Sequence, residues 1–148
     1  MKANETTFQK LVEGSKQFQI PLYQRPYSWG LEELERLWDD LTDQIATDRD
    51  AEESGRSASP HFMGSIVLAP ELGFASKLSR ILVIDGQQRL TTLSIALAAI
   101  RDRLRAVEVL DPDDFSGADK IDGVYLINQF EKKDDRYRLS PTQVDRAS

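Results

Sequence analysis

The spacing of apolar and polar residues in the first third of the chain predicts two helices and a strand. A short helix over 8–12, capped by Thr6 or Thr7 and ended by Gly14, precedes a strand over 17–20 that a proline stops. Ser28 is then expected to cap a second helix. Its apolar residues recur at helical spacing and predict one buried face over 31–45: Leu31, Leu34, Leu37, Trp38, Leu41 and Ile45.

The rest of the chain alternates between β-rich and helical patterns. A polar, charged segment over 48–60 is expected to be a mobile loop. After it, the patterns predict strands over 62–69 and 80–84, a helix over 90–107, a linker over 111–117, a helix over 118–130 weakened by Gly123, and a strand over 137–140. These elements predict a fold that combines strands and helices. The 148 residues are expected to form one domain over 1–148.

Composition narrows the range of functions. Hydrophobic residues make up 40% and charged residues 30%, as in ordinary globular domains. No apolar run is long enough to span a membrane and no signal peptide begins the chain, so a cytoplasmic protein without a membrane partner is expected. There is no cysteine and His61 is the single histidine, so a zinc site, a histidine-asparagine-histidine nuclease and a serine hydrolase triad are not expected. Nuclease activity is therefore not expected in this chain.

Charge is distributed unevenly along the sequence. The net charge of −6 argues against a protein that coats nucleic acid by bulk electrostatics. Ten acidic residues against two arginines lie between Glu32 and Glu53, whereas six basic residues against two acidic ones lie between Lys77 and Arg105. A polyanion could meet one favourable face, and Arg101, Arg103 and Arg105 are candidates for it. Two solvated helix faces of opposite sign explain the charge equally well.

The sharpest motif is ILVIDGQQRLTTL at 81–93, in which a strand runs through a glycine directly into a helix. The first N–H groups of a helix lack partners within it and favour an anion. Gly86 lets a phosphate approach the backbone, Arg89 can fork onto phosphate oxygens, and Thr91 and Thr92 add hydroxyl donors. The ending glycine-lysine-threonine (or serine) of a Walker A loop is missing. On residue types alone, a capped turn with Arg89 paired to a surface acid is as well supported.

The remaining side chains of this motif have several possible tasks. Gln87 and Gln88 can bind phosphate, base or an attacking water, and Asp85 could hold Mg²⁺, orient water or cap the helix. Asp85, Gln87, Gln88 and Arg89 are therefore the candidate catalytic residues.

A second motif, IPLYQRPYSW at 20–29, is a proline-stiffened loop. Aromatic faces stack on bases and Arg25 can contact a phosphate. Trp29 is expected to pack against the core instead. Tyr23, Gln24 and Arg25 are the candidate ligand-binding residues of this loop.

Together with HFMGSIVL at 61–68, these motifs resemble the N-terminal domain family of GmrSD-type modification-dependent restriction enzymes, over about residues 8–137. The resemblance implies an α/β (α+β) fold with a small mixed sheet, flanking helices and a ParB/sulfiredoxin-like core. It further implies that residues 85–89 bind and hydrolyse a nucleoside triphosphate with Mg²⁺. Sulfiredoxin chemistry itself needs a cysteine, which is missing. Family members are longer, so a helical region and a nuclease domain are expected to lie outside this chain, whose C-terminus looks like a cut.

Within that family, the sequence looks similar to the SspE-type effectors of phosphorothioate-based antiphage defence. That likeness implies modified double-stranded DNA as a partner, with phosphorothioate as the sensed mark. Sulfur is larger and less well hydrated than oxygen, so walls from Tyr23, Pro26, Tyr27 and Trp29 could favour it, with Arg25 holding the charge. Three alternatives stay open: a sensor of glucosylated DNA, a DNA- or protein-binding module without turnover, and a partner protein that uses the 31–45 helix. The nucleotide and the oligomeric state are not predicted.

Overall fold

The computed structural model describes residues 4–57, 60–71, 77–107, 117–142 and 145. By its contacts the chain divides into two compact units. The first comprises Met1–Pro26 and Ile66–Ser148 and contains the sheet, and the second comprises Tyr27–Ser65 and contains one long helix. The second unit is therefore an insertion between two parts of the first.

The first unit is built on a four-stranded mixed sheet in the order β2-β3-β1-β4. Its strands are β1 (Lys16–Gln19), β2 (Val67–Pro70), β3 (Ser79–Asp85) and β4 (Leu139–Ser140). Strand β1 runs parallel to both β3 and β4, and β2 pairs with β3 in the antiparallel sense. The sheet confirms the predicted mixed α/β class, and β1 and β3 lie within one residue of their predicted bounds.

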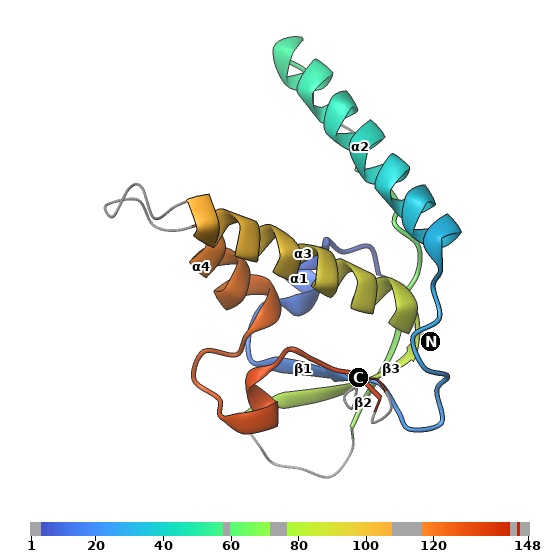
Figure 1. The fold of residues 1–148 in the computed structure, drawn as a ribbon, viewed down its shortest axis with the longest axis vertical. Helices are drawn as coiled ribbons and strands as arrows, with labels where there is room; N and C mark the ends of the chain where they lie inside the picture. Colours follow the sequence, from blue (N-terminus) through green and yellow to red (C-terminus); the bar gives the residue numbers. More distant parts are fainter. Residues whose placement is uncertain (1–3, 58–59, 72–76, 108–116, 143–144, 146–148) are drawn as a thin grey trace. The chain divides into compact units, whose positions relative to one another are not determined.

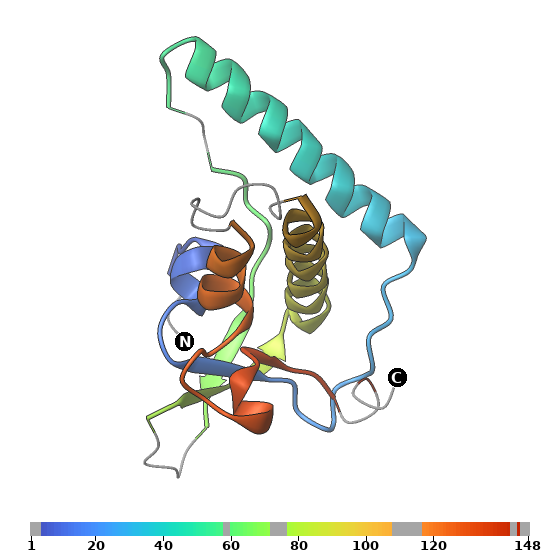
Figure 2. The same ribbon diagram turned by 60° about the vertical axis from the view of Figure 1, so that its left-hand side comes forward.

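Helices α1 (Phe8–Val12), α3 (Gln87–Val107) and α4 (Gly117–Ile121) lie on one face of this sheet (Figures 1 and 2). Thr7 caps α1 as predicted, because its hydroxyl accepts a hydrogen bond from the Lys10 N–H at 3.3 Å. The buried core between helices and sheet consists of Val12, Phe18, Ile20, Val83 and Leu90. Burying these side chains is the main favourable contribution to the stability of this unit.

The C-terminal part of the first unit differs from the predicted helix over 118–130. After α4 the chain makes one π-helical turn, η2 (Asp122–Leu126), and Ile127 is already extended. A short 3₁₀ turn, η3 (Lys133–Arg136), precedes β4. The helix stops because the side-chain amide of Asn128 donates to the Lys16 carbonyl of β1 at 3.0 Å, which holds the chain against the sheet.

A buried arginine fastens this C-terminal part to the N-terminus. The Arg138 guanidinium donates hydrogen bonds to the carbonyls of Val12 at 2.7 Å, of Gly123 at 3.0 Å, and of Gly14. Burial lowers the pKa of Arg138 from its ordinary value. One side chain thus connects α1, η2 and β4, segments that are far apart in the sequence.

The second unit contains α2 (Leu31–Glu53), which corrects two predictions. The residue at the N-cap is Gly30, not Ser28, and the Glu33 carboxylate accepts a hydrogen bond from the Gly30 N–H at 2.9 Å. The helix also continues through 48–53, where a loop was predicted, because no glycine or proline interrupts it before Gly55, whose φ is +64°.

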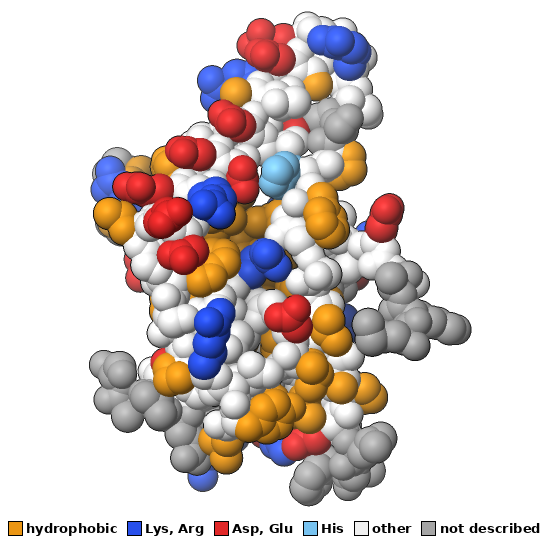
Figure 3. All heavy atoms as spheres, turned by 90° about the vertical axis from the view of Figure 1, so that its right-hand side faces the viewer, with side chains coloured by type: hydrophobic (Ala, Val, Ile, Leu, Met, Phe, Trp, Pro, Cys, Tyr) orange, Lys and Arg blue, Asp and Glu red, His pale blue; other side chains and the backbone are white. Residues whose placement is uncertain are grey.

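The apolar face of α2 is not buried, contrary to prediction. Trp38 is 67% exposed, Leu31 and Ile45 are exposed too, and Ala51 is the one buried residue of this helix. No other helix or strand lies among the described residues of this unit. The apolar side chains of α2 therefore have no second element within the unit to pack against. Acidic side chains occur along the whole helix (Figure 3).

The predicted strand over 62–69 is shorter in the structure. It begins at Val67, and Gly64 before it has a φ of +100°, which an extended strand does not accommodate. Phe62 is 80% exposed. The predicted linker over 111–117 falls outside the described residues except for Gly117, the first residue of α4. Among the described helices, none combines the length and apolar character that crossing a bilayer requires.

Candidate functional site

The candidate site is the junction between β3 and α3. Strand β3 leaves the core after Val83 and ends at the exposed Asp85, and α3 begins at Gln87. Between them, Gly86 has a φ of +88°, and its carbonyl accepts the Leu90 N–H at 3.0 Å as the first hydrogen bond of the helix. The Asp85 carboxylate accepts the Gly86 N–H at 2.8 Å. The junction therefore has the strand–glycine–helix geometry that the sequence predicts.

A helix of 21 residues starts at this point, so its first N–H groups offer partial positive charge to an anion. Arg89 and Thr91 are half-buried in the first turns of α3. Thr92 is buried, and its hydroxyl donates to the Gln88 carbonyl at 2.9 Å. The Thr92 hydroxyl is thus directed into its own helix, whereas Arg89 and Thr91 remain partly accessible to a ligand.

Gln87 and Gln88 contact the loop that carries the second motif. Both are 7% exposed. The side-chain amide of Gln87 donates to the Arg25 carbonyl at 3.0 Å, and that of Gln88 donates to the Pro26 carbonyl at 3.1 Å. Oε1 of Gln87 is buried and has no hydrogen-bond partner among the described residues. Both amides therefore have a structural contact that the sequence does not reveal.

A third side-chain amide, that of Gln24, connects the same two segments in the other direction, from the loop to the junction. The backbone turns at Pro21, whose carbonyl accepts the Gln24 N–H at 3.0 Å, and the Gln24 side chain donates to the Ile84 carbonyl at 2.9 Å. We call the side-chain amides of Gln24, Gln87 and Gln88 the amide clamp. The clamp joins the 21–26 loop to the β3–α3 junction, so the two motifs, separated by about 60 residues, form one site.

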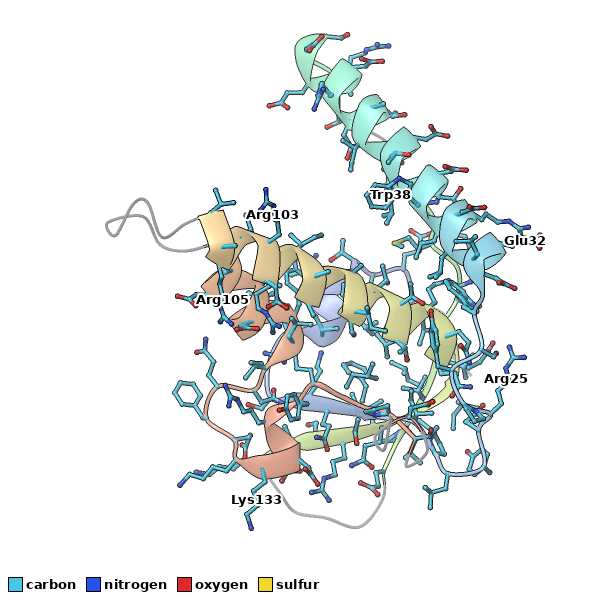
Figure 4. All side chains as sticks on the ribbon, in the orientation of Figure 1. Arg25, Glu32, Trp38, Arg103, Arg105 and Lys133 are labelled. Carbon is cyan, nitrogen blue, oxygen red and sulfur yellow. The ribbon has the colours of Figure 1, made fainter. Side chains whose placement is uncertain are left out.

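The candidate sensing residues are divided between the two units. Tyr23 is 75% exposed and Arg25 and Pro26 are exposed on the clamped loop. The Arg25 side chain projects away from the loop (Figure 4). Tyr27 and Trp29 are half-buried and belong to the second unit. The structure thus groups residues 23–26 with the junction and leaves Tyr27 and Trp29 to the other unit.

The three arginines near the end of α3 do not form one basic face. Arg101 and Arg105 make ion pairs with the Asp122 carboxylate, at 2.8 and 2.5 Å, and hydrogen bonds to Asp122 and Asp102 raise the pKa of Arg101. Arg103 lies on a different side of α3 from Arg105 (Figure 4). These ion pairs of Asp122 were not predicted from the sequence, although an acidic residue within an apolar helical pattern often indicates a buried ionic partner.

A magnesium ion that is held mainly by phosphate oxygens fits this site. In the described part of the chain, no group of three histidine, aspartate or glutamate side chains could hold a metal. Mg²⁺ in phosphate sites needs only one or two protein carboxylates besides the substrate oxygens. Asp85 supplies one such carboxylate, exposed and immediately before the helix N-terminus.

Comparison with known protein families identifies one that matches. The family model described as the N-terminal domain of the GmrSD restriction endonuclease matches residues 8–148. No curated protein matches the chain. The matched range contains both motifs, the whole sheet and the second unit.

Proposed function

This chain belongs to the family of GmrSD restriction endonuclease N-terminal domains, and from that premise we propose that it binds and hydrolyses a nucleoside triphosphate while sensing a DNA modification. Membership gives the chain a role in the restriction of foreign DNA, with DNA as a partner. The nucleotide, its hydrolysis and the sensed mark are the proposal. Phosphorothioate DNA is the mark we favour, and a nuclease domain of the same protein is the proposed recipient of the signal.

The observation that carries the proposal is the clamped junction itself. The N-terminus of α3 can bind phosphate, Arg89 in its first turn can add a fork of donors, and Gly86 has no side chain to block approach. The carboxylate of Asp85 would repel a triphosphate at this place unless a cation lay between them. A nucleotide with Mg²⁺ satisfies both groups, and that metal would neutralise charge on the transferred phosphoryl group.

The chain's own residues have separate tasks in this scheme. Arg89 binds phosphate oxygens, Asp85 holds the metal or orients the attacking water, and Thr91 adds a hydroxyl donor. On the clamped loop, Tyr23 and Arg25 are exposed and face the DNA backbone, where an aromatic surface favours the poorly hydrated sulfur.

The decisive measurement is triphosphate hydrolysis by the full-length protein, with unmodified DNA and with phosphorothioate DNA. Loss of a phosphate-binding arginine commonly costs several kcal/mol of transition-state stabilisation, so Arg89→Ala should lower kcat/KM by about 100-fold or more. Arg136→Ala, which removes an exposed arginine of η3, should leave turnover unchanged. Hydrolysis that is stimulated by phosphorothioate DNA and not by unmodified DNA supports the favoured mark. Equal turnover on both DNAs keeps the hydrolysis and redirects the search to glucosylated DNA.

A second function is favoured by a specific observation. Gln87 and Gln88 donate to backbone carbonyls and Asp85 accepts the Gly86 N–H, so these side chains also have purely structural uses. That is the arrangement expected of a DNA- or protein-binding module without turnover. Asp85→Ala separates the two functions, because it should abolish hydrolysis in the first and spare DNA binding in the second. Absence of turnover with every triphosphate and every DNA would reject the first.

A further inference from the structure

The second unit is attached to the first at the candidate site. The chain leaves the first unit at Pro26, whose carbonyl accepts the Gln88 side-chain amide. It returns at Ile66, and the next residue, Val67, pairs with Asp85 at the end of β3. Both connections are therefore fixed within three residues of Gly86.

The two connections are held by different kinds of hydrogen bond, from the backbone in one and from side chains in the other. The returning connection continues into β2, which is hydrogen-bonded along β3, although the register shifts between Val67 and Leu68. The leaving connection is held by side-chain amides instead: Gln87 and Gln88 donate to the carbonyls of Arg25 and Pro26, and Gln24 holds the loop just before them. A change at the β3–α3 junction therefore acts on the leaving connection through these side chains.

Gln87 offers a ligand a hydrogen bond without giving up its own. Its Nε2 is bound to the Arg25 carbonyl, which fixes the orientation of the amide and leaves Oε1 as a buried acceptor without a partner in the described part of the chain. A phosphate oxygen cannot satisfy an acceptor. A hydroxyl, an amino group or a metal-bound water can. Occupying Oε1 strengthens the Nε2 bond, because hydrogen bonds through one amide polarise each other.

We propose that a nucleoside triphosphate bound at the β3–α3 junction restrains the second unit, because the amide clamp that it strengthens also fixes the chain connection to that unit. This inference rests on the proposed nucleotide site. Gln87 and Gln88 are then positioning residues that transmit occupancy of the site. By linkage, a ligand that prefers the clamped state also binds more weakly when the clamp is lost.

The test follows the second unit directly in the full-length protein. Spin labels at Lys132→Cys and Asp43→Cys, two exposed positions in different units, report the distribution of distances between the units. This chain contributes no other cysteine. The probes are the nonhydrolysable analogues of the four ribonucleoside triphosphates, each with Mg²⁺. Binding of each probe is measured separately by calorimetry.

For the unsubstituted clamp, the distance distribution should narrow when a triphosphate binds. In Gln87→Met/Gln88→Met, where the side chains keep their approximate size and lose their donors, the distribution should be broad with and without ligand. The affinity of that variant should fall by about 5-fold or more. Gln129→Met removes an exposed glutamine amide and should behave like the unsubstituted protein. If circular dichroism shows that the double variant does not fold, the single variant Gln88→Met is measured in its place.

Three results would overturn the inference. Binding without narrowing rejects the coupling and leaves the nucleotide site intact. Narrowing that persists in the variant without the clamp amides shows that another path restrains the second unit. Absence of binding by all four triphosphates rejects the nucleotide site, and the inference with it.

Discussion

At the scale of single residues, the amides of the second motif and of the junction are the informative side chains. Glutamine is neutral and has both a donor and an acceptor, so it can hold a backbone carbonyl and still present an oxygen to a ligand. Gln87 does the first through Nε2 and leaves Oε1 for the second. A carboxylate at this position would repel the Arg25 carbonyl instead, which gives a physical reason for an amide here.

Gly86 provides a stability prediction at this scale. Its φ of +88° lies in the left-handed region, where an added Cβ is unfavourable, so Gly86→Ala should destabilise the protein by about 1–2 kcal/mol. The measurement is the urea unfolding midpoint. Gly123→Ala is the matched control, because its new Cβ would meet only the far end of the exposed Gln129 side chain, at 2.5 Å. A loss of stability that is equal in both variants would contradict the assigned backbone requirement.

At the scale of elements, the start of α2 shows how one carboxylate substitutes for a capping side chain. Gly30 at the N-cap has no side chain, and Glu33 reaches back to accept its N–H at 2.9 Å. This bond, followed by one from the N–H of Glu33 itself, lowers the pKa of Glu33 below its ordinary value. The charged form of Glu33 is therefore the form that the folded helix favours.

The pH dependence of the α2 start follows from this lowered pKa. The stabilisation by Glu33 is fully present above the unfolded pKa of about 4.3 and is lost as the pH falls through the lower folded value. The protection factor of the Gly30 amide, which is its NMR exchange rate corrected for the intrinsic rate at each pH, should fall over that acidic range. Glu33→Gln should weaken protection of the Gly30 amide at neutral pH. Glu35→Gln, an exposed position two residues further along α2, should not. Protection that does not change as the pH falls below the unfolded pKa of about 4.3 would contradict the cap.

At the scale of the whole molecule, the core belongs entirely to one of the two units. The buried side chains Val12, Phe18, Ile20, Val83 and Leu90 all lie in the first unit, although residues 27–65 interrupt its sequence. Each such side chain contributes about 1.5–3 kcal/mol when it is fully buried. The second unit has a single buried residue among its described positions, Ala51.

We therefore expect the first unit to fold without the second. Replacing residues 27–65 by a flexible glycine–serine linker should leave a cooperative thermal transition and a well-dispersed NMR spectrum. Replacing residues 4–15 by the same linker should abolish both, because it removes the Val12 side chain and helix α1, which positions the Val12 carbonyl for Arg138. A collapsed spectrum for the first replacement would show that the second unit is needed for folding.

Local sequence was sufficient for several features of this protein. Helix α1, strands β1 and β3, and the strand–glycine–helix junction follow from periodicity and from the special properties of glycine and proline. The family that the sequence resembles is likewise confirmed, since the matching family model covers residues 8–148. These features depend on neighbours in the chain, which a sequence displays directly.

The contacts between these elements became apparent from the tertiary structure alone. The amide clamp ends on the carbonyls of Ile84, Arg25 and Pro26, which are backbone groups that every sequence contains. Burial of α2 failed as a prediction because periodicity marks an apolar face and says nothing of a neighbour to cover it. Residue types along the chain indicated which side chains could bind a ligand. Long-range hydrogen bonds determined that the two motifs form one site, because such bonds depend on the position of the backbone and not on residue type.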